Sequence, residues 1–404
     1  MSDISEYRDK AKAIKKEREE HKKKQHEKGK LSAWERIDLL LDKGTFVEIG
    51  LLVGPKPTGS GTEEKHILSD GVVTGYGAVD GRRVFLFAQD FAAHGGTLGE
   101  MHGKKIAKVM RLAIDNGCPM IGLLDSGGAR IEEGISALDA YAKIFSLNVE
   151  ASGIVPQISA VLGPCAGGAA YSPALSDFVL MVEGISNMFV TGPNVIKKVT
   201  GEEVSFEDLG SAKIHSHKSG VCHIVSATEK ECIASIKKLL SYLPSNYMDL
   251  PPKKQSFAAL KVPKVAGIVP ENLEKTYDMK RLINAIFDPQ SFFEVHKDFA
   301  ENAIVGFARL GGHPVGIITT QPMKRAGCLD ISSSEKISRF INLCDAFNIP
   351  IISLVDVPGY LPGVQQEQGG IIKHGAKILY SISNSTVPKI ALIIRKAFGG
   401  AYIA

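Results

Sequence analysis

The sequence lacks the cysteine spacing, the apolar runs and the charge excess that mark several classes of protein. Its six cysteines contain no C-x-x-C pair, so we expect reduced, mostly buried thiols rather than a zinc ribbon or a redox dithiol. The N-terminal stretch MSDISEYRDKAKAIKK has no apolar core of the signal-peptide type, and no run of 18 apolar residues occurs. These absences predict a cytoplasmic protein.

A strong charge of one sign is also missing. The formal net charge is +4, and Lys and Arg are spread over most of the chain. This balance argues against a nucleic-acid partner and against a membrane surface, while a small acidic ligand stays open.

The usual motifs of catalytic and metal sites are absent as well. The chain contains no G-x-S-x-G, H-E-x-x-H or G-x-x-x-x-G-K-[ST] pattern. His215 and His217 would share one face of a strand, but a metal needs further ligands that the sequence does not indicate. We therefore expect no metal in this chain.

What the sequence does contain is an alternation of strands and helices. Residues 71–90 read as a hairpin that turns at Asp80-Gly81, residues 104–117 have helical apolar spacing, and residues 119–125 read as a buried strand. This order is typical of parallel β-α units. A chain of 404 residues with 44% hydrophobic composition is long enough for two or three domains.

The same pattern occurs twice along the chain. KIAKVMRLAIDNGCPMIGLLDSGG at 105–128 corresponds to KISRFINLCDAFNIPIISLVDVPG at 336–359, an offset of 231. The corresponding pairs are Lys105 with Lys336, Pro119 with Pro350, Asp125 with Asp356, and, offset by 232, Gly167-Gly168-Ala169 with Gly399-Gly400-Ala401. We predict a duplicated domain, with an N-terminal domain at 1–245, a linker at 246–266 and a C-terminal domain at 267–404.

The second copy is shorter than the first. It stops three residues after Ala401, whereas the first copy continues for roughly 75 residues after Gly168. We expect the second domain to be truncated and the chain to be a piece of a protein of about 480–520 residues.

Each Gly-Gly-Ala follows an apolar strand and precedes a predicted helix. Backbone N–H groups at such a junction can hold an anion, and the alternative is a close helix–sheet contact that has no room for a side chain. One strand earlier in each copy, an aspartate ends the predicted strand: Asp125 in the first copy and Asp356 in the second. They are either acids or bases, or acceptors of backbone hydrogen bonds in the following turns.

Residues 5–28 predict a strongly charged helix that ends at Gly29. Its basic side chains either form a solvated face or bind a phosphate-bearing ligand. These side chains are Lys15, Lys16, Arg18, Lys22, Lys23, Lys24 and Lys28.

Long ordered blocks of the chain resemble the carboxyltransferase β subunit of biotin-dependent acyl-CoA carboxylases of the propionyl-CoA or acetyl-CoA type. The blocks include GKLSAWERIDLLLDKGTFVEI (29–49), DGVVTGYGAVDGR (70–82), LLDSGGARIEEG (123–134), GPCAGGAAYSPALSDF (163–178) and RKAFGGAY (395–402). The resemblance implies an α/β fold of two tandem crotonase-like ββα-spiral domains. It also implies a homo-hexamer whose active sites lie between subunits.

The resemblance further implies a division of labour between the two glycine motifs. Gly167 and Gly168 would hold the thioester oxygen of acyl-CoA as an enolate forms, and Gly400 and Ala401 would hold the ureido oxygen of carboxybiotin, next to Gly399. The biotin nitrogen would remove the α-proton. The remaining implied acyl-CoA and reaction-centre residues are Gly127, Gly128, Ala129, Arg130, Ala169, Tyr171, Tyr402 and Ile403.

No A-M-K-M biotinylation site and no ATP-binding domain occur, so the biotin carboxyl carrier protein and the biotin carboxylase should be separate chains. Arg130 either lies near the CoA phosphates or stabilises a turn through a salt bridge. Two alternatives to the carboxylase stay open. One is the α subunit of a sodium-pumping methylmalonyl-CoA or glutaconyl-CoA decarboxylase, which runs the same chemistry in reverse beside a membrane partner. The other is a non-catalytic assembly subunit.

Overall fold

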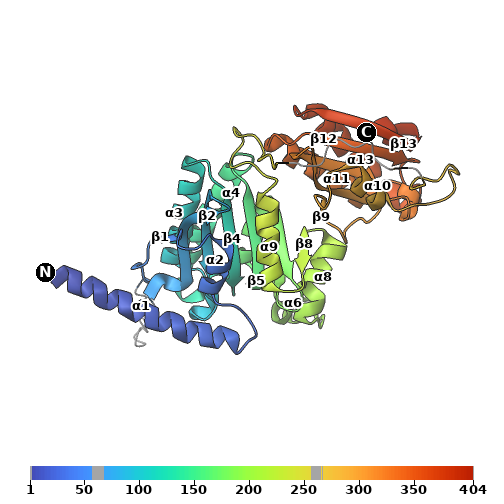
Figure 1. The fold of residues 1–404 in the computed structure, drawn as a ribbon. Helices are drawn as coiled ribbons and strands as arrows, with labels where there is room; N and C mark the ends of the chain where they lie inside the picture. The colour runs from blue at the N-terminus through green and yellow to red at the C-terminus, as the bar shows by residue number, and fades with distance from the viewer. Residues whose placement is uncertain (1, 57–67, 256–264, 266, 404) are drawn as a thin grey trace. The chain divides into compact units, whose positions relative to one another are not determined.

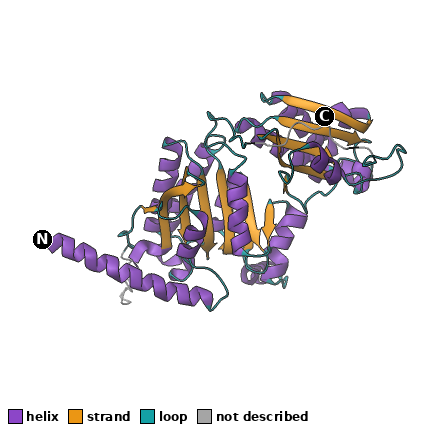
Figure 2. Ribbon diagram, viewed as in Figure 1, coloured by secondary structure: helices purple, strands orange, loops and turns teal. Residues whose placement is uncertain are grey.

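The computed structural model describes residues 2–56, 68–255, 265 and 267–403, which form two compact α/β units (Figures 1 and 2). Unit 1 comprises Met1–His215 and Val225–Lys238, and unit 2 comprises Ser216–Ile224 and Leu239–Ala404. Part of the predicted linker, at 256–264 and 266, lies outside the described residues.

Unit 1 is built on an eight-stranded mixed sheet in the order β1-β2-β3-β4-β5-β6-β8, with β7 paired to β5. Strands β1 to β3 are antiparallel, whereas β3 to β6 run parallel. The strands are β1 (Val47–Glu48), β2 (Val72–Val79), β3 (Arg82–Gln89), β4 (Met120–Ser126), β5 (Gln157–Ala166), β6 (Phe178–Val182), β7 (Asn187–Phe189) and β8 (Ile224–Ser226).

The helices of unit 1 cover this sheet, and β4 is buried along its whole length because parallel strands are covered on both faces. In α3, residues Ile106, Val109, Met110 and Ala113 are buried at the predicted helical spacing. The helices are α1 (Ser2–His26), α2 (Ala33–Leu40), α3 (Glu100–Asp115), α4 (Ile135–Ala151), α5 (Gly168–Leu175), α6 (Pro193–Thr200), α7 (Phe206–Gly210), α8 (Ala212–Ile214) and α9 (Glu229–Leu240).

Unit 2 is built on a five-stranded sheet in the order β13-β12-β11-β10-β9, in which β9 to β11 are antiparallel and β11 to β13 are parallel. Its strands are β9 (Phe293–Val295), β10 (Ala303–Leu310), β11 (His313–Thr320), β12 (Ile351–Val357) and β13 (Lys389–Ala397). Its helices are α10 (Met279–Ile286), α11 (Ile331–Ala346), α12 (Val364–Gln368), α13 (Ile371–Asn384) and α14 (Gly399–Ile403).

The two units repeat one fold, as the sequence predicts. An offset of 231 carries the bounds of β2, β3, α3 and β4 onto those of β10, β11, α11 and β12 without a residue of difference. Even the register shift after Leu124, where β4 pairs with β5, recurs after Val355, where β12 pairs with β13. The prediction of an α/β protein with two tandem domains is confirmed.

Local chemistry explains the matching hairpins. Asp80 and Gly81 both have positive φ, 49° and 76°, which is the geometry of the two-residue turns that join twisted antiparallel strands. Gly311 and Gly312 take the same place in unit 2, with φ of 58° and 82°.

The cysteines are reduced, as expected, and five of the six are buried. In the part of the chain that the structure describes, no helix combines the length and the apolar character needed to cross a bilayer.

Candidate functional site

The first Gly-Gly-Ala lies between the end of β5 and the first residues of α5. Gly167 is the N-cap residue, with φ 59° and ψ −124°, a conformation that favours glycine. Its N–H donates to the carbonyl of Phe189 in β7 at 3.0 Å. The N–H of Gly167 is thus engaged within the fold, and its predicted role as a donor to a ligand stays a prediction.

Gly168 and Ala169 occupy the first two positions of α5, where a helix cannot satisfy its own N–H groups. Within the described residues, no backbone or side-chain group outside the helix accepts a hydrogen bond from either amide. Both amides also lie at the positive end of the helix. This pair, one residue later than predicted, is the part of the motif that can hold an anion.

The loop that follows β4 lies against this turn. A Cβ added to Gly128 would be 2.8 Å from the carbonyl oxygen of Ala166, so only glycine permits this approach. Gly127 donates to Gly95 at 2.9 Å, and Ala129 forms an isolated parallel bridge with Leu98. The structure thus brings the predicted Gly127–Ala129 loop and the start of α5 together.

Gly168 also makes the close contact that was the alternative interpretation. A Cβ there would be 3.0 Å from the ring of Tyr141 in α4. Tyr141 is buried, its hydroxyl has no hydrogen-bond partner among the described residues, and burial raises its pKa. A tyrosine in an amphipathic helix carries no signal of such a contact, so the sequence could not predict it. Tyr171 is 48% exposed and packs edge-on against Phe145, which in turn packs against Tyr141.

Arg130 is buried, and both terminal nitrogens of its guanidinium are engaged, whereas its Nε has no hydrogen-bond partner among the described residues. Its guanidinium lies 2.6 Å from Asp70 and 2.7 Å from Glu133, and it also donates to the carbonyl of Thr97. Two carboxylates neutralise its charge, which leaves none for a CoA phosphate. The contacts therefore match the second of its two predicted roles, a turn held by salt bridges.

The second Gly-Gly-Ala begins α14. Gly399 has φ 59°, as Gly167 does, but no atom of the described residues lies within 4 Å of a Cβ added to Gly399 or Gly400. Among the described residues, no group outside the helix accepts a hydrogen bond from these amides or from that of Ala401. Residues 401–403 border a largely apolar cavity of about 280 Å³ between the sheet and helices α11 and α13. Ala401, Tyr402 and Ile403 therefore border one cavity, and their place at a reaction centre stays a prediction.

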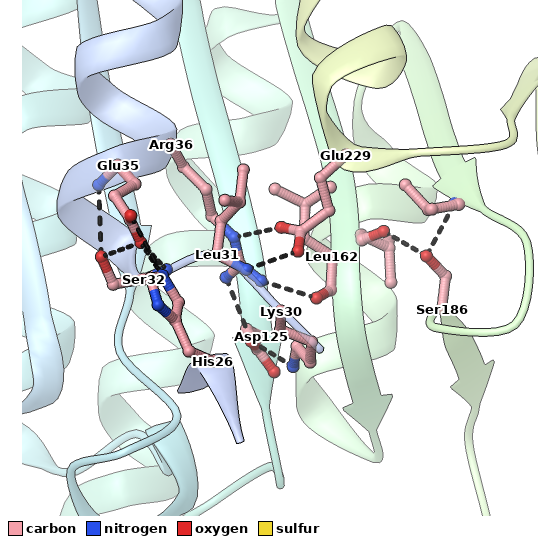
Figure 3. A network of polar contacts seen from close by, with 12 residues as sticks. His26, Lys30, Leu31, Ser32, Glu35, Arg36, Asp125, Leu162, Ser186 and Glu229 are labelled. Atoms are coloured by element: carbon pink, nitrogen blue, oxygen red, sulfur yellow. Dashed lines mark hydrogen bonds and ion pairs between the residues drawn. The ribbon is translucent and has the colours of Figure 1, made fainter. Parts of the chain in front are cut away.

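The two aspartates at the strand ends are buried anchors. Asp125 accepts from Lys30 at 2.5 Å and from Arg36 at 3.0 Å (Figure 3). Asp356 accepts from Tyr277 at 2.8 Å and from Arg395 at 3.1 Å. Both carboxylates are at most 1% exposed, and Asp356 also borders the cavity that residues 401–403 line.

The remaining candidates do not form a site. His215 and His217 lie in one short helical segment, His215–Ser219, rather than in a strand, so they do not share the predicted face. In the stretches that the structure describes, no group of three or more His, Cys, Asp or Glu side chains could hold a metal ion. In α1, Arg18 lies 2.8 Å from Glu48 and stacks on Trp34, while Lys22 pairs with Glu35. The exposed lysines of α1 are Lys10, Lys12, Lys15, Lys16, Lys23 and Lys24, and Lys28 is exposed in the turn that follows the helix.

Comparison with known proteins adds a family to this geometry. The carboxyl transferase domain model matches residues 24–404. A propionyl-CoA carboxylase carboxyltransferase subunit of Haloferax mediterranei is 53% identical over 94% of this chain and 74% of its own length. A methylmalonyl-CoA decarboxylase α subunit of Veillonella parvula is also 53% identical, over 96% of this chain and 76% of its own. The crystal structure of a transcarboxylase 12S hexamer with methylmalonyl-coenzyme A bound superposes with a TM-score of 0.96 at 44% identity, covering 100% of this chain and 79% of that one.

Proposed function

The chain belongs to the carboxyl transferase domain family, and from this premise we propose that it transfers a carboxyl group between carboxybiotin and the α-carbon of propionyl-CoA or acetyl-CoA. The relatives named for propionyl-CoA carboxylase support the substrate class. Carboxybiotin would be presented by a separate carrier protein and regenerated by a separate biotin carboxylase. A homo-hexamer is the assembly to test first, because the similar transcarboxylase 12S is a hexamer.

The observation that carries the proposal is the pair of unpartnered amides at the start of α5. Removing the α-proton of a thioester places negative charge on its oxygen. The amides of Gly168 and Ala169 would donate to that oxygen, and each fixed donor in such a site contributes about 3–4 kcal/mol to the transition state. The loop Gly127–Ala129 would form the facing wall. Acid and base side chains are not needed, because positioning and anion stabilisation are the work of the protein.

The second motif fits the carboxybiotin side. Gly399, Gly400 and Ala401 correspond to Gly167, Gly168 and Ala169 at an offset of 232, and Gly399 has the same φ of 59° as Gly167, so the backbone turns in the same way at the start of the helix. When bound there, carboxybiotin supplies the carboxyl group and a nitrogen base. Tyr402 and Ile403 would border the acyl chain. One methylene changes binding in an apolar pocket by only about 1–3 kcal/mol, so acetyl and propionyl chains should both be accepted.

The experiment is carboxyl transfer to free biotin from labelled methylmalonyl-CoA and malonyl-CoA, followed by a forward comparison of acetyl-, propionyl- and methylcrotonyl-CoA. We expect transfer by the protein and its loss in Gly400→Val, whose Cβ meets no atom of the described residues within 4 Å. Full transfer by Gly400→Val would refute the biotin-side assignment. No transfer and no acyl-CoA binding by the protein would support the assembly subunit instead.

A decarboxylase α subunit is the second candidate function, and the equal 53% identity to the Veillonella parvula protein is the observation that favours it. The same site would catalyse carboxyl transfer to acyl-CoA and from acyl-CoA, so the partner proteins determine which direction the enzyme serves. Co-purification with a biotin carboxylase supports the carboxylase, whereas co-purification with a membrane decarboxylase subunit supports the alternative.

A further inference from the structure

Four charged side chains of unit 1 form a buried cluster that the proposed chemistry does not use: Lys30, Arg36, Asp125 and Glu229 (Figure 3). Lys30 and Arg36 both donate to Oδ2 of Asp125, and Nε of Arg36 donates to Glu229 at 2.6 Å. The side chains of Arg36 and Asp125 are completely buried. Water screens these interactions little, so the cluster holds its geometry firmly.

Arg36 connects the two strands that lead into the candidate site. It donates to Asp125 in β4 and, at 2.9 Å, to the carbonyl of Leu162 in β5, while Glu229 attaches it to α9 (Figure 3). β4 continues into the Gly127–Ala129 loop, and β5 continues into the turn before Gly168. A guanidinium has five donors in a rigid fork, so one side chain can fix all three elements at once.

Lys30 reaches Asp125 through a gap that a glycine leaves. A Cβ added to Gly163 in β5 would be 2.0 Å from Oδ1 of Asp125 and 2.5 Å from Nζ of Lys30. At the corresponding position of unit 2, offset by 232, stands Arg395, which pairs with Asp356 directly. The first repeat thus takes its cations from the segment that precedes it.

The segment that carries Lys30 and Arg36 is itself held in place. Ser32 caps α2 in a reciprocal capping box with Glu35, and His26 lies 2.9 Å from the same carboxylate. Although burial raises the pKa of Glu35, hydrogen bonds from Ser32 and His26 lower it to about 2, so the carboxylate stays charged. Arg36 follows on the first turn of α2, with its direction fixed by this cap.

We propose that Lys30 and Arg36 are positioning residues for the acyl-CoA side of the site. They hold the ends of β4 and β5, so that the Gly127–Ala129 loop and the amides of Gly168 and Ala169 keep the spacing that an enolate oxygen requires. This inference rests on the proposed function. A displacement of about 1 Å at such donors can cost up to about 100-fold in rate, so a distant anchor can control kcat.

The test compares Lys30→Gln with the conservative Lys30→Arg and with the surface control Arg111→Gln, which breaks the exposed pair of Arg111 with Glu150. For carboxyl transfer to free biotin, we expect Lys30→Gln to lower kcat about tenfold while the KM for biotin stays unchanged. Lys30→Arg should restore most of the rate, and Arg111→Gln should have no effect. Arg36→Lys, which keeps the charge but not the fork, should reproduce the loss.

Amide hydrogen exchange supplies a readout that does not depend on activity. We expect Lys30→Gln to speed exchange at 127–130 and to leave the corresponding loop at 358–361 unchanged. A lowered melting temperature with wild-type kcat and wild-type exchange at 127–130 would overturn the inference and leave the cluster a purely structural one. If the wild-type protein transfers no carboxyl group, the proposed function fails by itself, and the exchange measurement still decides whether the cluster positions the loop.

Discussion

The two repeats neutralise the same buried aspartate in different ways. Asp356 in unit 2 is paired by Arg395, which stands on the adjacent strand of the same repeat. Asp125 in unit 1 faces Gly163 at that position and is paired by Lys30 and Arg36, which precede the repeat. Both repeats therefore have a buried aspartate where the strand register shifts. The cation that pairs with this aspartate comes from a different part of the chain in each repeat.

The comparison also shows why the first repeat depends on its N-terminal segment. Removing Arg395 would affect one repeat internally, whereas removing residues 26–36 would leave Asp125 and Glu229 buried without cations. Uncompensated buried charge is among the most destabilising changes in a protein. The segment is therefore part of unit 1.

The largest expected effect separates the two aspartates. Asp125→Asn should destabilise unit 1 by about 3–5 kcal/mol, because Lys30 and Arg36 stay buried with one carboxylate less. Asp356→Asn should cost unit 2 only about 1–3 kcal/mol, because Arg395 also donates to three backbone carbonyls. Urea unfolding monitored by hydrogen exchange in each unit measures both. Equal losses would contradict the comparison.

The next largest effect is expected at two corresponding buried lysines, whose replacement should destabilise the two units to different degrees. Lys336 in α11 donates its three N–H groups to the carbonyls at 296, 299 and 303, with the carbonyl at 300 more distant at 3.4 Å, whereas Lys105 in α3 donates to two carbonyls, at 69 and 72. Replacement by Met leaves these buried carbonyl oxygens without a hydrogen-bond donor. We therefore expect the free energy of unfolding to fall by about 2–4 kcal/mol for Lys336→Met and by about 1–3 kcal/mol for Lys105→Met. Thermal unfolding of the two variants gives the order, and a larger loss for Lys105→Met would reverse it.

Alanine substitutions at Gly168 and Gly400 should differ in their effect on stability. Gly168→Ala places a Cβ 3.0 Å from the ring of Tyr141 and should cost about 1–3 kcal/mol. Gly400→Ala meets no atom within 4 Å and, within a helix, should change stability by less than about 1 kcal/mol. Melting temperatures test the difference, and the transfer assay shows whether both still lose activity.

The smallest effect is a difference in acid sensitivity. Burial lowers the pKa of His102 in unit 1, and burial lowers the pKa of both His223 and His296 in unit 2, the latter to about 3. Below about pH 6.5 the unfolded chain binds protons that these folded imidazoles do not, so stability falls by up to about 1.4 kcal/mol per histidine for each further pH unit.

Unit 2 should consequently lose stability faster than unit 1 between pH 6.5 and 5.5. In unit 1, the raised pKa of His21 beside Asp90 opposes the lowered pKa of His94. Urea midpoints of each unit at the two pH values test this, with His296→Gln as the variant that should flatten the slope of unit 2. A steeper loss in unit 1 would count against the expected sign.

Much of the fold could be predicted because its signals are local. The turn at Asp80-Gly81, the apolar spacing from Ile106 to Ala113 and the repeated strand–aspartate pattern each depend on neighbouring residues and on periodicity. The histidines at 215 and 217 were misplaced on a strand for the same reason: a spacing of two fits a strand, and nothing nearby signalled a helical turn.

The sequence by itself determined that the chain is a duplicated α/β fold with a glycine pair at the start of one helix in each copy. Only the tertiary structure decided which of those amides are available, because the N–H of Gly167 is taken by Phe189, a residue of a later strand. It alone decided that Lys30 and Arg36, rather than a side chain at 163, balance Asp125. Backbone geometry follows from local sequence, whereas hydrogen-bond partners and counter-ions come from segments that meet only when the chain folds.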